Sequence, residues 1–340
     1  IKFPIEIIRR TREAVGDNFI IIYRLSMLDL VEGGSTWEDV VQLAKAIEAA
    51  GATIINTGIG WHESRVPTIG TVVPKAGFAW VTKKMMGEVN IPLITTNRIN
   101  MPDVAEKVLT EGNADMVSMA RPFLADPKLV LKSIEGRPEE INTCIACNQA
   151  CLDHTFTMQV SSCIVNPRAC HETILVHEPS KQKKKIAVVG AGPAGLEAAT
   201  VAAKRGHAVV LFEEKHEIGG QFNMAKIIPG KEEYDQTIRY YDSMLKKYGV
   251  EVRLDSRAEE ATLIAEAYDE IILATGVIPR TLEIEGIDHH KVMDYVDVLY
   301  KKKTVGDKVA ILGSGGIGFD MAEYLAHDMA HESASINIEN

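Results

Sequence analysis

A glycine-rich turn between a strand pattern and a helix pattern constrains most strongly what the second half of this chain can fold into. Gly190, Gly192 and Gly195 form a G-x-G-x-x-G run that follows a β-branched segment and precedes a helical one. A second strand pattern, residues 208–212, ends at Glu213, which lies 18 residues past the last glycine. Such glycines let the backbone approach a pyrophosphate at a helix N-terminus, and the acid accepts a hydrogen bond from a ribose hydroxyl. The sequence therefore predicts a Rossmann-like dinucleotide-binding domain.

Two later features of the sequence favour FAD as the dinucleotide. Ala191 lies inside the turn, Gln221 follows the pair Gly219-Gly220, and Gly276 ends a later strand pattern. Paired glycines and a turn of small residues at these two places are typical of FAD-binding domains rather than NAD-binding domains. We expect Ala191, Gln221 and Gly276 to line the FAD site.

A second glycine fingerprint follows at Gly313, Gly315 and Gly318, after the apolar segment 308–312. This arrangement suits a nicotinamide-nucleotide domain inserted into an FAD domain. The chain ends before the residue that separates NADPH from NADH, so this pattern leaves both open.

Four of the five cysteines form the pattern Cys-x2-Cys-x3-Cys-x11-Cys, at Cys144, Cys147, Cys151 and Cys163. Fe–S clusters are held by cysteine thiolates, here three from one loop and a fourth that completes the set. The alternative is a structural zinc ion, but such sites usually contain two Cys-x2-Cys pairs and this chain has one. We predict a [4Fe–4S] cluster, with Cys170 left as an unligated thiol, buried or free.

The first half of the chain repeats a pattern of buried strand followed by helix, which predicts a parallel sheet. The strands are expected at residues 18–26, 52–56, 92–96 and 114–119, and the helices at 4–15, 36–50, 103–111 and 127–134. Polar side chains gather where the strands end, namely Arg24, His62, Glu63, Arg65, Asn97, Arg98 and Arg121. (β/α) barrels keep their sites at that rim, and arginine offers a fork of donors to a phosphate or an anionic ring. Four units are half of an eight-stranded barrel, and a doubly wound sheet is the alternative.

Composition and charge narrow the partners. The 340 residues carry a net charge of −10, with a pI near 5.6, which argues against nucleic acid or an anionic membrane as a partner. No apolar run reaches the length of a transmembrane helix. Clustered cysteines in an odd total suit a reducing compartment, so a cytoplasmic location is expected. The chain begins inside a helical pattern without an initiator methionine, and we expect it to be part of a longer polypeptide.

Several motifs together resemble the flavin barrel of the Old Yellow Enzyme superfamily. They are Arg24-Leu-Ser-Met, Asn56-Thr-Gly-Ile-Gly-Trp-His-Glu-Ser-Arg65, Thr96-Asn-Arg98 and Met119-Ala-Arg-Pro-Phe-Leu-Ala-Asp-Pro127. The cysteine segment and the first glycine fingerprint extend the likeness to the larger architecture of trimethylamine dehydrogenase and the enoate reductases. Within this family the chain most resembles the bacterial NADPH-dependent 2,4-dienoyl-CoA reductases.

The resemblance implies four residues that bind FMN. Arg24 would face the N1/O2 edge of the flavin, where its charge stabilises the anionic reduced form. Arg121, together with the backbone of Ala120, would bind the FMN phosphate. Arg98 would support the flavin from the neighbouring strand end.

The resemblance also implies a substrate site on the loop after the second strand. His62 would lie over the substrate and assist its protonation as the catalytic acid. Glu63, Ser64 and Arg65 would line the acyl-CoA side.

These roles combine into a relay of electrons. NADPH, with NADH as the alternative, would reduce FAD, and electrons would cross the [4Fe–4S] cluster to FMN. Hydride would then pass to the conjugated double bonds of a 2,4-dienoyl-CoA, as in the β-oxidation of unsaturated fatty acids. The alternatives are a sibling enoate or steroid reductase or amine dehydrogenase, and a non-catalytic electron-transfer subunit.

The expected domains follow the same order along the chain. They are the second half of an FMN-binding TIM barrel at 1–140, the cluster segment at 141–172, a linker at 173–185, an incomplete FAD domain at 186–305 and the start of a nicotinamide domain at 306–340.

Overall fold

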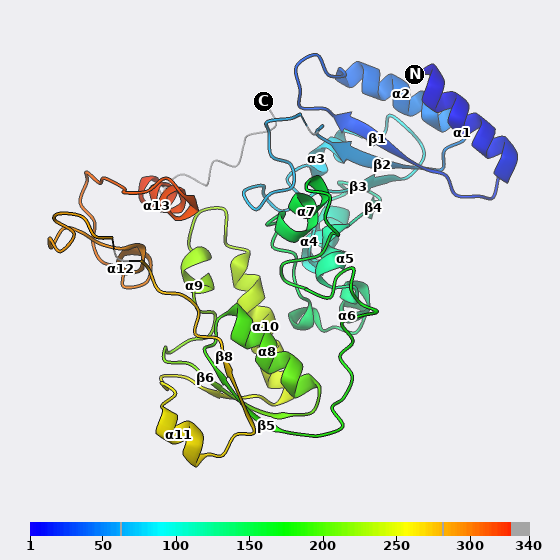
Figure 1. Ribbon diagram of the computed structural model, residues 1–340. Coiled ribbons are helices and arrows are strands. Elements are labelled where there is room, and N and C mark those ends of the chain that lie inside the picture. Colours follow the sequence, from blue (N-terminus) through cyan, green and yellow to red (C-terminus); the bar gives the residue numbers. More distant parts are fainter. Residues whose placement is uncertain (62, 281, 328–340) are drawn as a thin grey trace. The chain divides into compact units, whose positions relative to one another are not determined.

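The computed structural model describes residues 1–61, 63–280 and 282–327 (Figure 1). They form two compact units, Ile1–Cys170 and a second one that begins at His171. Each unit contains a four-stranded parallel sheet with helices beside it. The predicted α/β class is therefore confirmed, whereas the finer domain boundaries stay predictions.

The sheet of the first unit consists of β1 (Ile22–Leu28), β2 (Ile54–Ile59), β3 (Leu93–Thr95) and β4 (Met116–Val117). The strands pair in chain order and all run parallel. A doubly wound sheet reverses its strand order, so this uninterrupted order is that of an arc of a barrel wall. β2 reaches Ile59, into a segment expected to be loop, because Thr57 and Ile59 are buried against neighbouring elements.

Six helices and three short turns accompany this sheet in the described residues. They are α1 (Lys2–Val15), α2 (Trp37–Ala49), α3 (Ala79–Met85), α4 (Pro102–Thr110), α5 (Arg121–Ala125), α6 (Leu129–Ile134), the 3₁₀ turn Pro138–Glu140, the π-helical turn Gln149–Asp153 and the single turn α7 (His154–Phe156). α3 and α5 were not expected from the sequence, because each is shorter than the window over which helical periodicity is visible.

The start of α2 shows how local sequence fixes one of these helices. Thr36 accepts a hydrogen bond from the backbone of Asp39, and the Asp39 carboxylate accepts one from the Thr36 backbone. Such a capping box stabilises a helix by about 1 kcal/mol. From this start, Val40, Ala44 and Ile47 recur at helical spacing and are buried in the core beneath β1 and β2.

The second unit places its strands in a different order. Its sheet contains β5 (Lys185–Val189), β6 (Ala208–Phe212), β7 (Glu251–Arg253) and β8 (Glu270–Leu273), arranged β7-β6-β5-β8. Its helices are α8 (Pro193–Lys204), α9 (Phe222–Ala225), α10 (Tyr234–Tyr248), α11 (Glu260–Ala265), α12 (Tyr295–Leu299) and α13 (Gly316–Ala326). The order reverses at β5, and open α/β sheets bind ligands at such a point, outside the carboxyl ends of the strands.

The second glycine fingerprint differs from its expected context. α13 follows its glycines, but residues 308–312 before them are not a strand. A strand needs a neighbour for its backbone N–H and C=O groups, and this segment is not part of either sheet in the described part of the chain. The helical half of the fingerprint is therefore present without the strand half.

A buried pair between α8 and α10 gives a prediction about stability. The Tyr241 hydroxyl donates a hydrogen bond to Glu197 Oε2 at 3.1 Å. Burial raises the pKa of Glu197, although the Tyr241 hydrogen bond opposes the shift. A carboxyl whose pKa is higher in the folded state stabilises the protein at low pH and loses that contribution as the pH rises through the folded value.

Glu197→Gln keeps the acceptor and removes the charge. We therefore expect the variant to unfold at a higher temperature than the parent at pH 7, with the difference shrinking at acid pH. Thermal unfolding across pH measures this, with the exposed Glu285→Gln as the matched control. Equal midpoints for the Glu197→Gln variant and the parent at pH 7 contradict the prediction.

Candidate functional site

A line of polar side chains crosses the first sheet. The Arg24 guanidinium donates to Asn56 Oδ1 at 3.3 Å, and the Asn56 amide donates to Ser118 Oγ at 3.3 Å. Arg24 and Asn56 are register partners on β1 and β2, so the pairing of the strands itself places them together. Arg24 is exposed, and its charge is available to a ligand at this sheet. Asn56 and Ser118 were not predicted as site residues; a polar residue inside a buried strand pattern was the available signal.

Arg98 and Asn97 hold the segment that follows the substrate-site loop. Arg98 is buried, and its Nε donates to the backbone oxygen of Val73 at 2.8 Å. Asn97 donates to the backbone oxygen of Thr68 at 3.0 Å. Both residues have positive φ values, 73° for Asn97 and 58° for Arg98, so the chain turns sharply after β3. Arg98 thus holds the segment around Val73 by a buried hydrogen bond. Its predicted contact with FMN stays a prediction.

The predicted substrate loop begins directly after β2. His62 lies outside the described residues, so its catalytic role stays a prediction. Glu63 and Arg65 are exposed, and Ser64 is partly buried, with its hydroxyl accepting a hydrogen bond from the Val66 backbone at 3.1 Å. The exposed pair is accessible to a solute, whereas Ser64 shapes the turn.

Asp29 anchors the start of this loop and was not predicted. Its backbone oxygen accepts from the Trp61 N–H at 3.1 Å, and its carboxylate accepts from Ser26 Oγ at 2.5 Å and the Ser35 N–H at 2.8 Å. Burial opposes ionisation of Asp29, but the hydrogen bonds from Ser26, Ser35 and Trp61 outweigh it and lower the pKa. Asp29 is therefore a buried anion that holds Trp61, at the start of the loop, in place.

Arg121 lies at the first position of α5 and joins two segments. Its guanidinium donates to Asn148 Oδ1 and to the backbone oxygen of Ile69, the latter at 2.9 Å. Ala120, just before it, is exposed. Five N–H groups of an arginine can donate, and these two bonds leave donors for an anion. The predicted phosphate role of Arg121 and Ala120 is compatible with this geometry and stays a prediction.

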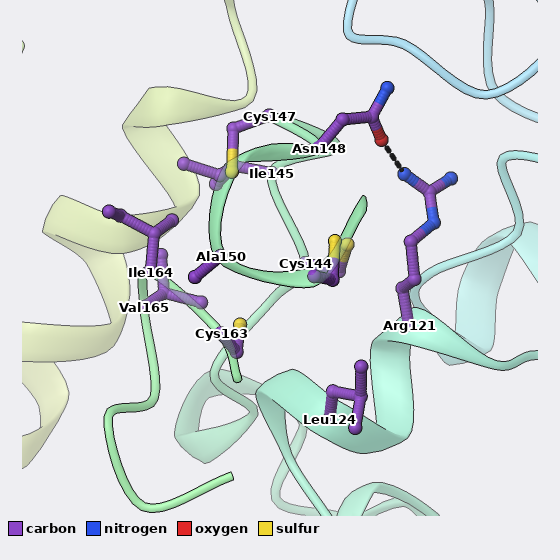
Figure 2. A pocket seen from close by; sticks show the side chains of 11 residues that line it. Arg121, Leu124, Cys144, Ile145, Cys147, Asn148, Ala150, Cys163, Ile164 and Val165 are labelled. Atoms are coloured by element: carbon purple, nitrogen blue, oxygen red, sulfur yellow. Dashed lines mark hydrogen bonds between the residues drawn. The ribbon is translucent and has the colours of Figure 1, made fainter. Parts of the chain in front are cut away.

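The four cysteines of the motif line one pocket in the first unit (Figure 2). The side chains of Cys144, Cys147 and Cys163 point toward the space that their loop encloses. The lining consists of Arg121, Leu124, Cys144, Ile145, Cys147, Asn148, Ala150, Cys151, Cys163, Ile164 and Val165. Cys170 does not line it and is exposed, so the prediction of a buried thiol is wrong.

Two thiols in this pocket, those of Cys147 and Cys163, have pKa values raised above that of a free thiol. Burial, with smaller contributions from the nearby Cys144 and Cys147, raises the pKa of Cys163 to about 11. Burial also raises the pKa of Cys147, with added contributions from Cys144 and Cys151. Thiolates are the metal-binding form, so a bound metal must displace these protons.

The donor types in the pocket match those of an iron–sulfur cluster, in which four cysteine thiolates surround a shared space. A structural zinc ion takes four thiolates as well, so the lining is compatible with both groups. The [4Fe–4S] cluster stays a prediction.

Buried hydrogen bonds fasten the cysteine segment to the first unit. Asp126 is buried, accepts from the Asn142 N–H at 2.9 Å and pairs with Lys132 at 2.5 Å. Asn142 in turn donates to the backbone oxygen of Val165 at 2.6 Å. The Asn100 amide donates to the backbone oxygen of Cys144 at 2.9 Å. The cysteines therefore stand on the same packed body as the sheet.

Asp126→Asn tests that attachment. Removing the charge leaves the partly buried Lys132 ammonium without its carboxylate partner, and we expect a loss of about 3 kcal/mol of unfolding free energy. Denaturant unfolding monitored by circular dichroism measures the loss. Asp17→Asn, at an exposed turn, is the control and should change stability by less than about 0.5 kcal/mol. Equal losses in both variants contradict the role of Asp126.

The glycine turn of the second unit has the closeness that its motif predicts. A methyl group on Gly195 would lie 1.8 Å from the Gly190 carbonyl oxygen, so α8 approaches the strand end at backbone distance. Gly190 has φ 102°, a conformation open to glycine. The Gly192 position has open space, which a ligand backbone or phosphate can enter. Gly220 was not predicted as a site residue, but a methyl group added to it would lie 2.8 Å from the Cα of Gly192.

Glu213 and Gln221 stand beside this turn. The Glu213 carboxylate accepts from the Ala191 N–H at 2.7 Å and from the Lys215 N–H at 3.0 Å. Gln221 donates to the backbone oxygen of Val277, next to Gly276, at 2.9 Å. The structure therefore brings together the residues predicted for FAD, from the ends of β5, β6 and β8.

The later fingerprint repeats the same close approach. A methyl group on Gly318 would lie 2.2 Å from the Gly313 carbonyl oxygen, and Gly315 caps α13. The three predicted nucleotide-binding glycines thus form a tight turn, although without the strand before it.

Comparisons with known proteins find one family model for the part of the chain with the first sheet and another for the part with the second. Residues 1–140 match the family described as NADH:flavin oxidoreductase / NADH oxidase, and residues 184–337 match the family described as pyridine nucleotide-disulphide oxidoreductase. These matches support the Old Yellow Enzyme-like family without singling out dienoyl-CoA reductases.

Relatives of known kind match nearly the whole chain. It is 40% identical to an NADH oxidase of Thermoanaerobacter brockii over 96% of this chain and 51% of the relative. It is 39% identical to a metal reductase of Desulforamulus reducens over 95% of this chain and 49% of the relative. A solved complex of 2-naphthoyl-CoA reductase with 2-naphthoyl-CoA is 39% identical, with a TM-score of 0.92, over 95% of this chain and 50% of that one. The chain thus spans about half the length of these relatives.

No helix in the described residues has the length and apolarity needed to cross a membrane.

Proposed function

We propose that this chain belongs to an NAD(P)H-dependent flavoprotein that reduces a C=C bond conjugated to the carbonyl of a CoA thioester. The main support for this proposal is the structural similarity to the 2-naphthoyl-CoA reductase complex, with a TM-score of 0.92 over 95% of the chain. The substrate in that complex is a thioester whose carbonyl is conjugated to unsaturated carbon. A 2,4-dienoyl-CoA has the same electronic arrangement and is the particular substrate that we propose, with NADPH as the donor and NADH as the alternative.

The cofactors of the proposal are FMN, FAD and a [4Fe–4S] cluster. When bound, they would supply hydride transfer and single-electron transfer. Cys144, Cys147, Cys151 and Cys163 would hold the cluster. The pocket that these four cysteines share supports a bound metal group, and the single Cys-x2-Cys pair of the sequence favours the cluster over zinc.

The chain's own residues would bind and orient. Arg24, steadied by Asn56, would stabilise negative charge at the first sheet, because a fixed cation lowers the free energy of a developing anion. Arg121 would bind a phosphate with its remaining donors. Glu213 already holds the glycine turn through Ala191 and would orient a ribose at the same place. His62 would deliver a proton to the substrate.

A second function is favoured by the relatives that are named as an NADH oxidase and a metal reductase. In that case the same centres would pass electrons to an acceptor other than an unsaturated acyl group. The enoate, steroid and amine substrates of sibling enzymes form a third possibility on the same scaffold.

Anaerobic turnover with the full-length protein separates these functions. Hexadienoyl-CoA, cinnamoyl-CoA, 2-naphthoyl-CoA, cinnamate, a steroid enone and trimethylamine are each mixed with the protein, the reducible substrates with NADPH or NADH. Nicotinamide oxidation is followed by absorbance and the product by mass spectrometry, with an artificial dye as the acceptor for trimethylamine. Reduction of hexadienoyl-CoA with the highest kcat/KM supports the particular proposal. Dye or ferric reduction without any reduced thioester rejects it in favour of electron transfer alone.

A further inference from the structure

The contact between Arg121 and Asn148 connects the rim of the first sheet to the cysteine pocket (Figure 2). Both side chains line that pocket together with the four cysteines. Arg121 begins α5, directly after β4, whereas Asn148 immediately follows Cys147 in the loop. A positive charge is thereby fixed beside the thiols by an uncharged side chain.

The backbone holds Asn148 in a defined position. Its φ of 59° is left-handed, a conformation that asparagine adopts more readily than most residues. Its backbone oxygen accepts hydrogen bonds from the N–H groups of Leu152 and Asp153, each at 3.1 Å. These bonds close the π-helical turn that carries Cys151, and such turns are frequent at functional sites. The side chain of Asn148 is therefore aimed by the same loop that presents the cysteines.

The second anchor of Arg121 keeps it in the same place. Its guanidinium donates to the backbone oxygen of Ile69, and the Asn148 amide lies 4.0 Å from the Cβ position of Gly70. Segments 69–70 and 148 thus hold the guanidinium from two sides. Within the described residues no carboxylate is among the lining of the pocket, so the arginine charge there is not cancelled by the pocket wall.

We propose that Asn148 is a positioning residue that holds the Arg121 guanidinium beside the cysteine pocket and thereby raises the reduction potential of the cluster. This inference rests on the iron–sulfur cluster of the proposed function. Reduction adds one electron to the cluster, and a fixed positive charge nearby stabilises the more negative form. Cluster potentials follow local charge and solvent exposure, so the contact acts on a measurable quantity.

Redox titration of the full-length protein, followed by the EPR signal of the reduced cluster, tests the role of Asn148. Asn148→Gly removes the amide and keeps the left-handed backbone without strain. We expect its cluster to be reduced at a more negative potential, with the reduced-to-oxidised ratio at a fixed potential falling about tenfold, or 59 mV for one electron. Iron and acid-labile sulfide contents should equal those of the parent.

Met158→Gly is the matched control. Met158 also has φ 59°, lies between Cys151 and Cys163, and is 93% exposed outside the pocket. The substitution loosens the same loop without touching the guanidinium, so its potential should equal that of the parent. Asn148→Gly should also add no further shift in an Arg121→Gln background, because the charge that it positions is gone.

The outcomes decide between the roles. A parent potential in Asn148→Gly, an equal shift in Met158→Gly, or a full shift that persists with Arg121→Gln overturns the inference. Loss of iron in Asn148→Gly alone also overturns it and makes Asn148 a residue of loop assembly. If Arg121→Gln does not fold, the comparison of the two glycine variants still decides. A parent protein without iron and sulfide rejects the proposed cluster itself, whereas a parent with a cluster and an unmoved variant rejects only this inference.

Discussion

Replacement of Cys147 by alanine is expected to abolish the iron–sulfur cluster and to leave the flavin of the second unit reducible by NAD(P)H. Cys147 is one of four cysteines around the pocket, and a four-iron cluster needs a thiolate for each iron. The glycine turn of the second unit belongs to a separate compact body, so its folding does not depend on this thiol. Iron and sulfide content, EPR and the anaerobic bleaching of flavin by NAD(P)H measure the two parts. Turnover of the acyl-CoA should fall by at least about a hundredfold, as for loss of a metal-site residue.

Cys170→Ala is the matched control for this variant. Cys170 is exposed and does not line the pocket, so iron content and turnover should both stay at the parent level. Full iron in Cys147→Ala contradicts the assignment of the ligands. Zinc without iron in the parent protein would instead support the structural alternative.

Replacement of Gly195 by alanine is expected to remove the flavin from the second unit and to destabilise it by more than about 4 kcal/mol. The added methyl would lie 1.8 Å from the Gly190 carbonyl oxygen and 3.3 Å from the Ala274 side chain. The first of these contacts is with backbone, so α8 has to move away from β5. Losses of this size are exceptional and are caused by a few mechanisms, of which steric overpacking is one. Flavin content and thermal unfolding of the purified protein measure the effect.

Alanine variants of two other glycines distinguish an effect on packing from an effect on ligand binding. Gly192→Ala meets no atom within 4 Å, so the variant should fold normally and lose affinity for the dinucleotide alone. Gly306→Ala also meets no atom within 4 Å and lies away from the turn, so it should change neither quantity. A stable, flavin-loaded Gly195→Ala protein would show that the close approach of helix and strand is not required.

Periodicity and turn chemistry predicted the parts of the fold that rest on local sequence. The strands of the first sheet and α2 and α4 follow directly from runs of β-branched residues and from apolar residues at helical spacing. The glycine turn at 190–195 was predictable in geometry as well, because only glycine permits the observed approach. α3 was missed since its burial comes from neighbouring elements and not from a periodic pattern of its own.

The sequence predicted many of the residues of the candidate site, but it predicted fewer of the contacts between them. Cysteine spacing predicted the four lining thiols, and the position after a strand predicted Arg121. Arg24 was expected near the end of a strand at 18–26, but β1 spans Ile22–Leu28 and Arg24 lies inside it. The bond between Arg121 and Asn148 joins residues 27 positions apart, and no local pattern encodes such a pairing. Asp29 was missed for the same reason, because its importance comes from burial and from donors on separate segments. The strand expected at 308–312 failed because a strand depends on a neighbour that local sequence does not supply.

The attachment of the cysteine loop through Asp126 and Asn142 has a kinetic consequence. Arg24, Arg121 and the four thiols are carried by one hydrogen-bonded body, so the gap between a cluster and a flavin at that sheet is set by covalent chain and core packing. In the proposed relay, the electron step between that cluster and that flavin should therefore proceed at a rate insensitive to solvent viscosity and crowding.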